Sequence, residues 1–256
     1  MNTKIFMAAV SQSKQLIMHD YKPHYILESF IWLKSKHKST LEYIQWCLQS
    51  DEFLLDSGAF TFMSKAKKAE TFSNEALREY IDQYIDFINK YDIKHFFEMD
   101  IDSVVGYENV KKIRKYIEEK TNKKVIPVWH KSRGIEEFHN MCKEYDYVAI
   151  GGIANKEIKK SEHHMLYDLC DIAHSYKCKV HGLGYSPPKV LNDRSCPFDT
   201  IDSTSWQGRR WKNIFVLEDG KLYRRQNNEK HWKDADRSSF EAWVNFSRLE
   251  DVYQNN

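Results

Sequence analysis

The sequence predicts an α/β protein built as a single-domain TIM-like (β/α)8 barrel that carries a short C-terminal β-hairpin and helix. Three observations support this fold class. Strand-like and helix-like segments alternate roughly seven or eight times over residues 5–206, which favours a closed parallel sheet. Most strand-like segments end on a carboxylate, a histidine or glycines. The chain has 256 residues, a length typical of such barrels.

The composition fits one domain with a large core. We assign residues 1–212 to the barrel and residues 213–256 to a hairpin-and-helix appendage packed on it. Hydrophobic residues make up 41% of the chain and aromatic residues 14%, so a sizeable core can form. The net charge of +2 excludes a general attraction for polyanions, and a nucleic-acid partner would need a local basic patch.

The cysteine pattern and the lack of long apolar runs predict a cytoplasmic protein. Five cysteines are scattered without a CxxC pair, which is typical of free thiols in a reducing compartment and not of disulfides or a zinc site. No apolar run is long enough to span a membrane, and residues 5–10 are followed by no convincing signal-peptide cleavage site. We therefore expect no membrane partner.

The hydrophobic pattern defines the elements in chain order. Short apolar runs predict strands at residues 5–10, 52–56, 93–100, 125–130, 147–152, 179–184 and within 196–206. Apolar residues spaced three and four apart predict helices at residues 24–33, 40–48, 73–90, 107–119, 135–143, 161–176 and 238–249. Asp219-Gly220 predicts a hairpin turn within residues 215–223.

The segment around Asp202 organises the rest of this prediction. Thr200 and Ile201 favour a strand, whereas Asp202 and Ser203 are poor strand formers and mark its end. In a β/α barrel, a polar side chain at the C-terminal end of a strand faces the mouth, where active sites lie. The alternative is that Asp-Ser only begins an Asx-turn.

The other strand ends carry chemistry of the same kind. They are Asp56-Ser57-Gly58, Glu98 with Asp100, His130, Gly151-Gly152, residues 181–184 (His-Gly-Leu-Gly) and Asp202. Neighbouring carboxylates repel, so one pKa rises and that group can carry a proton, while another stays ionised as a nucleophile. Glycines let a flat ligand lie against backbone amides. The set suits reaction at an anomeric carbon that has a planar leaving group.

Several alternatives remain open for these residues. Each acid can cap a loop, and Gly151-Gly152 can serve only a tight turn. A divalent metal bound by Asp56, Asp100, His130 and His181 is a competing hypothesis, although no HxH or HExxH spacing supports it. No GxGxxG or P-loop pattern occurs, so no dinucleotide or nucleoside-triphosphate site is indicated.

Four motifs, in order along the chain, resemble those of tRNA-guanine transglycosylases. Residues 56–60 (Asp-Ser-Gly-Ala-Phe) are similar to that family's Asp-Ser-Gly-Gly-Phe/Tyr motif, and residues 149–154 resemble its Gly-Gly-Leu segment. Residues 181–184 resemble its His-x-Leu/Met-Gly strand end, and residues 198–203 (Phe-Asp-Thr-Ile-Asp-Ser) resemble its nucleophile strand. The resemblance covers roughly residues 5–212.

One departure changes the expected substrate and cofactor. The tRNA enzymes carry a CxCxxC…His zinc site after the nucleophile strand, but residues 207–256 contain no cysteine. The chain more closely resembles the DNA-acting branch, the deoxypurine-in-DNA A proteins of phages and bacterial genomic islands. Those insert 7-deazaguanine derivatives into DNA. The resemblance therefore implies no cofactor, no metal, DNA as the polymer partner and a base such as 7-cyano-7-deazaguanine.

The resemblance also implies a role for each site residue. Asp202 is the nucleophile and Asp56 the proton carrier. Asp100 is expected to bind the edge of the base, with Glu98 and Asp102 as alternatives. The remaining base-binding residues by this resemblance are Ser57, Gly58, Phe60, Gly151, Gly152, Leu183 and Gly184, with Phe60 and Leu183 on the two faces of the base. His130 ends the strand that carries a base-contacting Gln in the tRNA enzymes, so it is included without an assigned role.

Residues 206–212 (Trp-Gln-Gly-Arg-Arg-Trp-Lys) directly follow the nucleophile strand. Aromatic side chains interleaved with cations suit base stacking and phosphate contact, so Trp206, Arg209 and Arg210 are expected to touch nucleic acid. The alternative is a solvated loop with Trp206 in the core.

The expected function is replacement of guanine in DNA by a 7-deazaguanine derivative through a covalent aspartyl–sugar intermediate. The alternatives are a tRNA-guanine transglycosylase, a glycosylase that only hydrolyses the base–sugar bond, and a non-catalytic nucleic-acid-binding relative.

Overall fold

The computed structural model describes residues 3–13, 21, 24–68, 73–207, 213–226 and 232–252. The strands are β1 (Lys4–Ala8), β2 (Tyr25–Ser29), β3 (Glu52–Asp56), β4 (His95–Phe96), β5 (Val128–Trp129), β6 (Tyr147–Ile150), β7 (Lys179–Gly182), β8 (Thr200–Ser203), β9 (Asn213–Glu218) and β10 (Lys221–Gln226). The helices are η1 (Val10–Ser13), α2 (Phe30–Leu33), α3 (Lys38–Cys47), α4 (Ala59–Lys68), α5 (Asn74–Lys90), α6 (Asp102–Val105), α7 (Tyr107–Thr121), η2 (Lys131–Arg133), α8 (Ile135–Glu144), η3 (Lys160–Glu162), α9 (Met165–Ser175), α10 (Pro188–Asn192) and α12 (Trp232–Val252).

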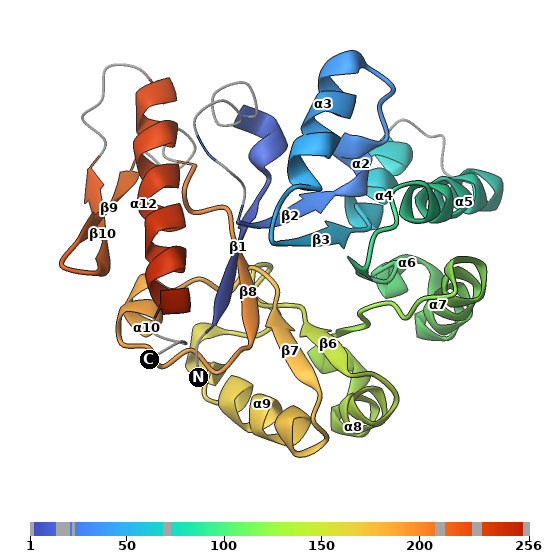
Figure 1. The fold of residues 1–256 in the computed structure, drawn as a ribbon. Coiled ribbons are helices and arrows are strands. Elements are labelled where there is room, and N and C mark those ends of the chain that lie inside the picture. The colour runs from blue at the N-terminus through green and yellow to red at the C-terminus, as the bar shows by residue number, and fades with distance from the viewer. Residues whose placement is uncertain are drawn as a thin grey trace.

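The first eight strands form one curled, all-parallel sheet. Their order is β4-β3-β2-β1-β8-β7-β6-β5, so the first strand of the chain pairs with the eighth. The two outer strands of this order meet through an isolated parallel bridge between Phe97 and Ile126, where Glu98 N–H donates to Ile126 O at 3.1 Å. Helices lie outside the sheet, as α5, α7, α8 and α9 do in Figure 1. The predicted TIM-like (β/α)8 fold is confirmed.

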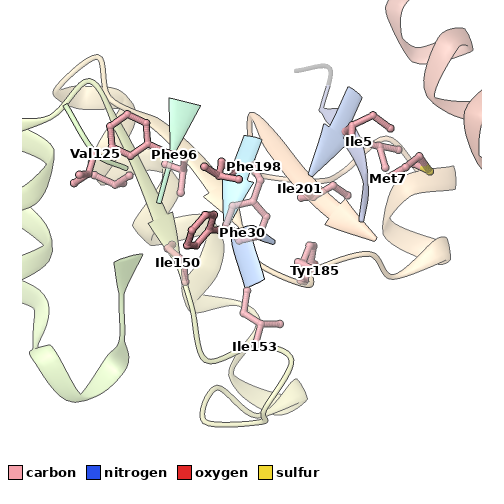
Figure 2. Packing of buried hydrophobic residues seen from close by; sticks show 14 of the residues in the cluster. Ile5, Met7, Phe30, Phe96, Val125, Ile150, Ile153, Tyr185, Phe198 and Ile201 are labelled. Atoms are coloured by element: carbon pink, nitrogen blue, oxygen red, sulfur yellow. The ribbon is translucent and has the colours of Figure 1, made fainter. Parts of the chain in front are cut away.

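Alternation along the strands sorts the core into two clusters, because successive side chains of a strand point to opposite faces. On β1, Phe6 and Ala8 belong to a cluster inside the barrel, whereas Ile5 and Met7 belong to the larger cluster between the sheet and the helices. Figure 2 shows part of this outer cluster, with Ile5 and Met7 beside Ile201 of β8. The same alternation directs Asp202 inward, one residue beyond Ile201.

The expectation of a helix over residues 24–33 is wrong. Residues 25–29 form β2, and only Phe30–Leu33 are helical. Tyr25 and Leu27 are buried inside the barrel while Ile26 is buried outside it, so both faces of this strand are covered. A strand buried on both faces reads as a continuous apolar run, which periodicity cannot distinguish from a short helix.

The C-terminal hairpin and helix are confirmed. In the turn between β9 and β10, Asp219 and Gly220 have φ of 49° and 70°, as a two-residue hairpin requires. Helix α12 packs along β9 and also contacts β1, so it lies against the barrel (Figure 1). Within the described ranges, no helix is both long and apolar enough to span a membrane.

Trp206 joins the barrel to this helix. Its side chain is fully buried, its indole N–H donates to Ala8 O at 3.0 Å, and its ring lies 5.1 Å from that of Phe240 on α12. The structure therefore places Trp206 in the core and not on a surface that could stack with bases, which corrects the expectation of nucleic-acid contact at this residue.

We predict that Trp206→Ala lowers the free energy of unfolding by about 3–5 kcal/mol, because it leaves a large cavity and an unpaired carbonyl. The matched control is Trp32→Ala, since Trp32 is 43% exposed, and its effect should stay within about 0.5 kcal/mol. Urea unfolding of both variants measures the difference. Equal stabilities for the two variants would contradict a core role for Trp206.

Candidate functional site

One cavity of about 1010 Å³ opens where the barrel strands end. Strand ends β3, β4, β6 and β8 supply Asp56, Asp100, Gly151 and Asp202 to its lining, as the parallel sheet requires. The predicted site residues that line it are Asp56, Phe60, Asp100, His130, Gly151, Gly152, Leu183, Gly184 and Asp202.

Asp202 is held by one of its two carboxylate oxygens. The backbone N–H of Gly184 donates to Oδ1 at 2.7 Å, and His181 Nε2 lies 3.3 Å from the same oxygen. Gly184 has φ of +68°, and a Cβ there would lie 2.9 Å from the Ala154 side chain, so glycine lets this loop bring its amide to Asp202. The side chain of Asp202 is 12% exposed and lines the cavity.

Asp56 lies at the end of β3, and the pKa of its carboxyl is raised above the ordinary value. Burial is the largest cause of its raised pKa, and the negative charges of Asp100 and Asp202 add to it. The hydrogen bond from the Gly58 N–H, 3.0 Å from Oδ2, and the nearby Ser29 hydroxyl oppose this rise in pKa without reversing it. Asp56 can therefore hold a proton at a higher pH than an ordinary aspartate.

His130 connects two carboxylates. Its Nε2 lies 2.8 Å from Asp100 Oδ2, and its Nδ1 lies 3.0 Å from Glu157 Oε2. Burial alone would lower the pKa of His130, but the hydrogen bond and charge of Asp100, with the bond to Glu157, raise it to about 9. The imidazolium therefore donates both N–H groups to carboxylates and restrains the position of Asp100.

The positive charge of Arg133 compensates the negative charges of Asp100 and of the two acids near it, Glu98 and Asp102. Its guanidinium lies 2.9 Å from Glu98 Oε1, 3.3 Å from Asp100 Oδ1 and 3.0 Å from Asp102 Oδ2. Glu98 is fully buried, is also paired with Arg114 at 2.7 Å, and does not line the cavity. Of the three acids considered for contact with a ligand, only Asp100 and Asp102 are placed to reach it.

The two glycines at the end of β6 differ in what they offer a ligand. The N–H of Gly151 donates to Trp129 O at 2.9 Å, and a Cβ on Gly151 would lie 2.7 Å from His130 Cε1. Gly151 therefore makes room for the His130 ring. Its amide is already hydrogen-bonded to Trp129 and is not available to a ligand. Gly152 has φ of +80°, and a Cβ there would meet Glu157 Oε2 at 2.9 Å. The expectation that the Gly151 amide binds a ligand is therefore wrong, whereas that for the Gly152 amide stays a prediction.

Other predicted residues lie outside the cavity lining. Ser57 is buried, and its carbonyl accepts a hydrogen bond from Tyr80 at 2.7 Å. Gly58 acts on the site indirectly, through its hydrogen bond to Asp56. A neighbouring acid that was not predicted as a site residue, Asp199, lies three residues before Asp202, pairs with His174 at 2.9 Å and does not line the cavity. Arg209 and Arg210 lie outside the described residues.

The lining residues that sequence reasoning missed include Trp32, Arg133 and Glu157. Trp32 lies three residues beyond the end of β2. Once β2 is recognised as a strand, this position predicts that Trp32 lies near the mouth of the barrel. Trp32 is 43% exposed and Phe60 is 74% exposed, so aromatic side chains form part of the rim. Nothing in the local sequence marks Arg133 or Glu157, because their charge partners come from other strands.

The fold and the site define a (β/α)8-barrel protein with an acid-rich mouth bordered by glycine turns. Among the residues that the structure describes, no three His, Cys, Asp or Glu side chains are arranged to hold a metal ion. No protein-family model matches the chain, and no curated protein matches it.

The raised pKa of His130 predicts a pH-dependent stability. Because its folded-state pKa of about 9 exceeds the unfolded value of 6.5, the stabilisation is fully present below pH 6.5 and is lost as the pH rises through about 9. His130→Gln should remove this dependence, with an effect on the order of 3 kcal/mol at pH 6. Urea unfolding at several pH values measures it.

The control for this measurement is His164→Gln, at an exposed histidine that does not line the cavity. It should leave the pH dependence of wild type unchanged. A wild-type stability that does not fall between pH 7 and pH 10, or a fall of the same size in His130→Gln, would contradict a charged His130.

Proposed function

We propose that the protein is a base-exchange transglycosylase that replaces guanine in DNA with a 7-deazaguanine derivative. The observation that carries the proposal is the convergence of Asp56, Asp100 and Asp202 on one cavity in three different chemical environments. Asp56 is half-buried with a raised pKa, Asp100 is ion-paired, and Asp202 is oriented by hydrogen bonds to one oxygen. A proton carrier, a binding acid and a nucleophile need these three environments.

The reaction follows as two displacements at the same sugar carbon. In the first, a carboxylate oxygen of Asp202 bonds to the anomeric carbon, the base–sugar bond breaks with its electron pair going to the base, and Asp56 donates a proton to the departing guanine. In the second, Asp56 takes a proton from the incoming base, whose nitrogen attacks the anomeric carbon. The ester bond then breaks, and its electron pair returns to Asp202.

The cavity wall offers contacts for a planar base. Gly152 presents backbone, while Phe60 and Leu183 can cover the two faces of a ring. Asp100 accepts hydrogen bonds in a fixed position, because His130 and Arg133 hold it. A guanine-like edge, which carries adjacent N–H donors, is complementary to such a carboxylate. These contacts favour a guanine-type base over a pyrimidine.

The rim favours a polymer substrate over a free nucleoside. Trp32 and Phe60 are exposed at the mouth, where unstacked neighbouring bases can stack on them. Exposed Lys34, Lys36 and Lys38 follow Trp32 directly and can contact phosphates. This is a local cationic segment on a chain with a net charge of only +2. This segment supports a nucleic-acid partner independently of residues 206–212, which were expected from the sequence to contact nucleic acid.

The test is exchange of isotope-labelled guanine and of 7-cyano-7-deazaguanine into DNA and into tRNA. Asp202→Asn should fold and lose exchange by at least about a thousandfold, the order lost when a key electrostatic group is removed. Asp199→Asn is the matched control, because this residue precedes the same strand but lies away from the cavity and should retain exchange.

The rival functions give different products. Exchange into tRNA but not into DNA would indicate a tRNA-guanine transglycosylase. An abasic site without base incorporation would indicate a hydrolytic glycosylase. No reaction with either polymer would indicate a non-catalytic binding protein. Near-wild-type exchange by Asp202→Asn would overturn the assignment of the nucleophile.

A further inference from the structure

A chain of buried hydrogen bonds leads from Asp202 into the barrel interior. The hydroxyl of Tyr147 lies 2.6 Å from Thr200 Oγ1, and the same oxygen lies 2.7 Å from Nδ1 of His181. The other ring nitrogen of His181, Nε2, lies 3.3 Å from Asp202 Oδ1. All four side chains are buried, and His181 is completely so.

Only one arrangement of protons in this chain of hydrogen bonds gives every donor an acceptor. The Tyr147 hydroxyl donates to Thr200, the Thr200 hydroxyl donates to Nδ1 of His181, and Nε2–H of His181 donates to Asp202 Oδ1. A proton on Nδ1 would make Thr200 Oγ1 its acceptor, and among the described residues the hydroxyl proton of either Thr200 or Tyr147 would then have no acceptor. Thr200 thus selects the Nε2–H tautomer of a neutral imidazole.

Packing fixes the orientation of the His181 ring. Its centroid lies 5.3 Å from that of Phe97 and 6.1 Å from that of Phe6, both inside the barrel. A Cβ on the next residue, Gly182, would lie 2.7 Å from the Phe198 ring, so glycine permits the close packing of this strand end. The imidazole cannot turn away from Asp202 without displacing these aromatic rings.

Both donors that reach Asp202 bind the same oxygen. Gly184 N–H and His181 Nε2 contact Oδ1, and no described residue donates a hydrogen bond to Oδ2. We infer that His181 is a positioning residue that, with Gly184, anchors Asp202 by Oδ1 and leaves Oδ2 as the oxygen that attacks the sugar. This inference rests on the proposed function, because it takes Asp202 as the nucleophile.

The arrangement serves both displacements. When Oδ2 bonds to the anomeric carbon, Oδ1 becomes the carbonyl oxygen of the ester and keeps its two donors. When the ester bond breaks, its electron pair returns to Oδ2, and the restored negative charge is shared with Oδ1, where Gly184 and His181 stabilise it. No proton moves along the Tyr147–Thr200–His181 chain in either step.

The test uses two substitutions of similar size at His181. Gln can place an amide N–H near the position of Nε2, whereas Met cannot donate at all. His181→Met should slow formation of the covalent adduct about 10- to 100-fold, the range seen when the partner that orients a reactive ligand is removed, while KM for the polymer stays unchanged. His181→Gln should recover most of the rate.

Thr200→Val is the third variant, since it keeps the side-chain shape but removes the hydroxyl that selects the tautomer. NMR spectra of 15N-histidine-labelled protein report that tautomer without any need for activity. Wild type should show neutral His181 with its proton on Nε2, and Thr200→Val should show a mixture of tautomers. Urea unfolding of each variant provides the folded fraction used to normalise its rate.

Two results would overturn the inference: an imidazole protonated on Nδ1 alone in wild type, whose Nε2 could not donate to Asp202, or equal adduct rates for wild type and His181→Met. Failure of the proposed function gives a different result. In that case wild type forms no adduct with any polymer, whereas the NMR spectra still show whether His181 donates to Asp202.

Discussion

Three carboxylates that share one cavity repel each other, and the surroundings of Asp56, Asp100 and Asp202 answer that repulsion in three different ways. Asp56 is half-buried, and its raised pKa lets it hold a proton at a higher pH than an ordinary aspartate. Asp100 forms ion pairs with His130 and Arg133. Asp202 accepts hydrogen bonds from a backbone amide and from a buried imidazole. The three environments are consistent with the separate chemical roles that we propose for these residues.

Different elements of the fold provide the groups that surround each of the three carboxylates. The barrel brings strand ends that are distant in sequence to one mouth, and glycine turns bring the Gly58 and Gly184 amides to Asp56 and Asp202. Helix η2 ends at Arg133, whose guanidinium pairs with Asp100 after the end of β4. The C-terminal helix α12 packs on β1 through Trp206 and Phe240, so apolar burial attaches it to the barrel.

Much of this arrangement could be predicted from the sequence, because strand alternation and polar strand ends are local signals. Asp56, Asp100 and Asp202 were located in this way, since a parallel barrel forces such ends together. Residues 24–33 were misassigned because β2 is buried on both faces and shows no alternation. Roles that depend on partners from other strands, such as those of Arg133 and Glu157, have no local signal at all. Trp206 adjoins cations in the sequence, but its burial depends on α12, which is distant in sequence.

The central claim is that Asp202 forms a bond to the sugar of a nucleic acid. Peptide mapping by mass spectrometry tests it most directly, on protein incubated with a guanine-containing DNA oligonucleotide and denatured before the second displacement. The account predicts one modified peptide, with the added sugar on Asp202 and free guanine released in equal amount. A sugar attached to any other residue, or guanine released without any modified peptide, would contradict it.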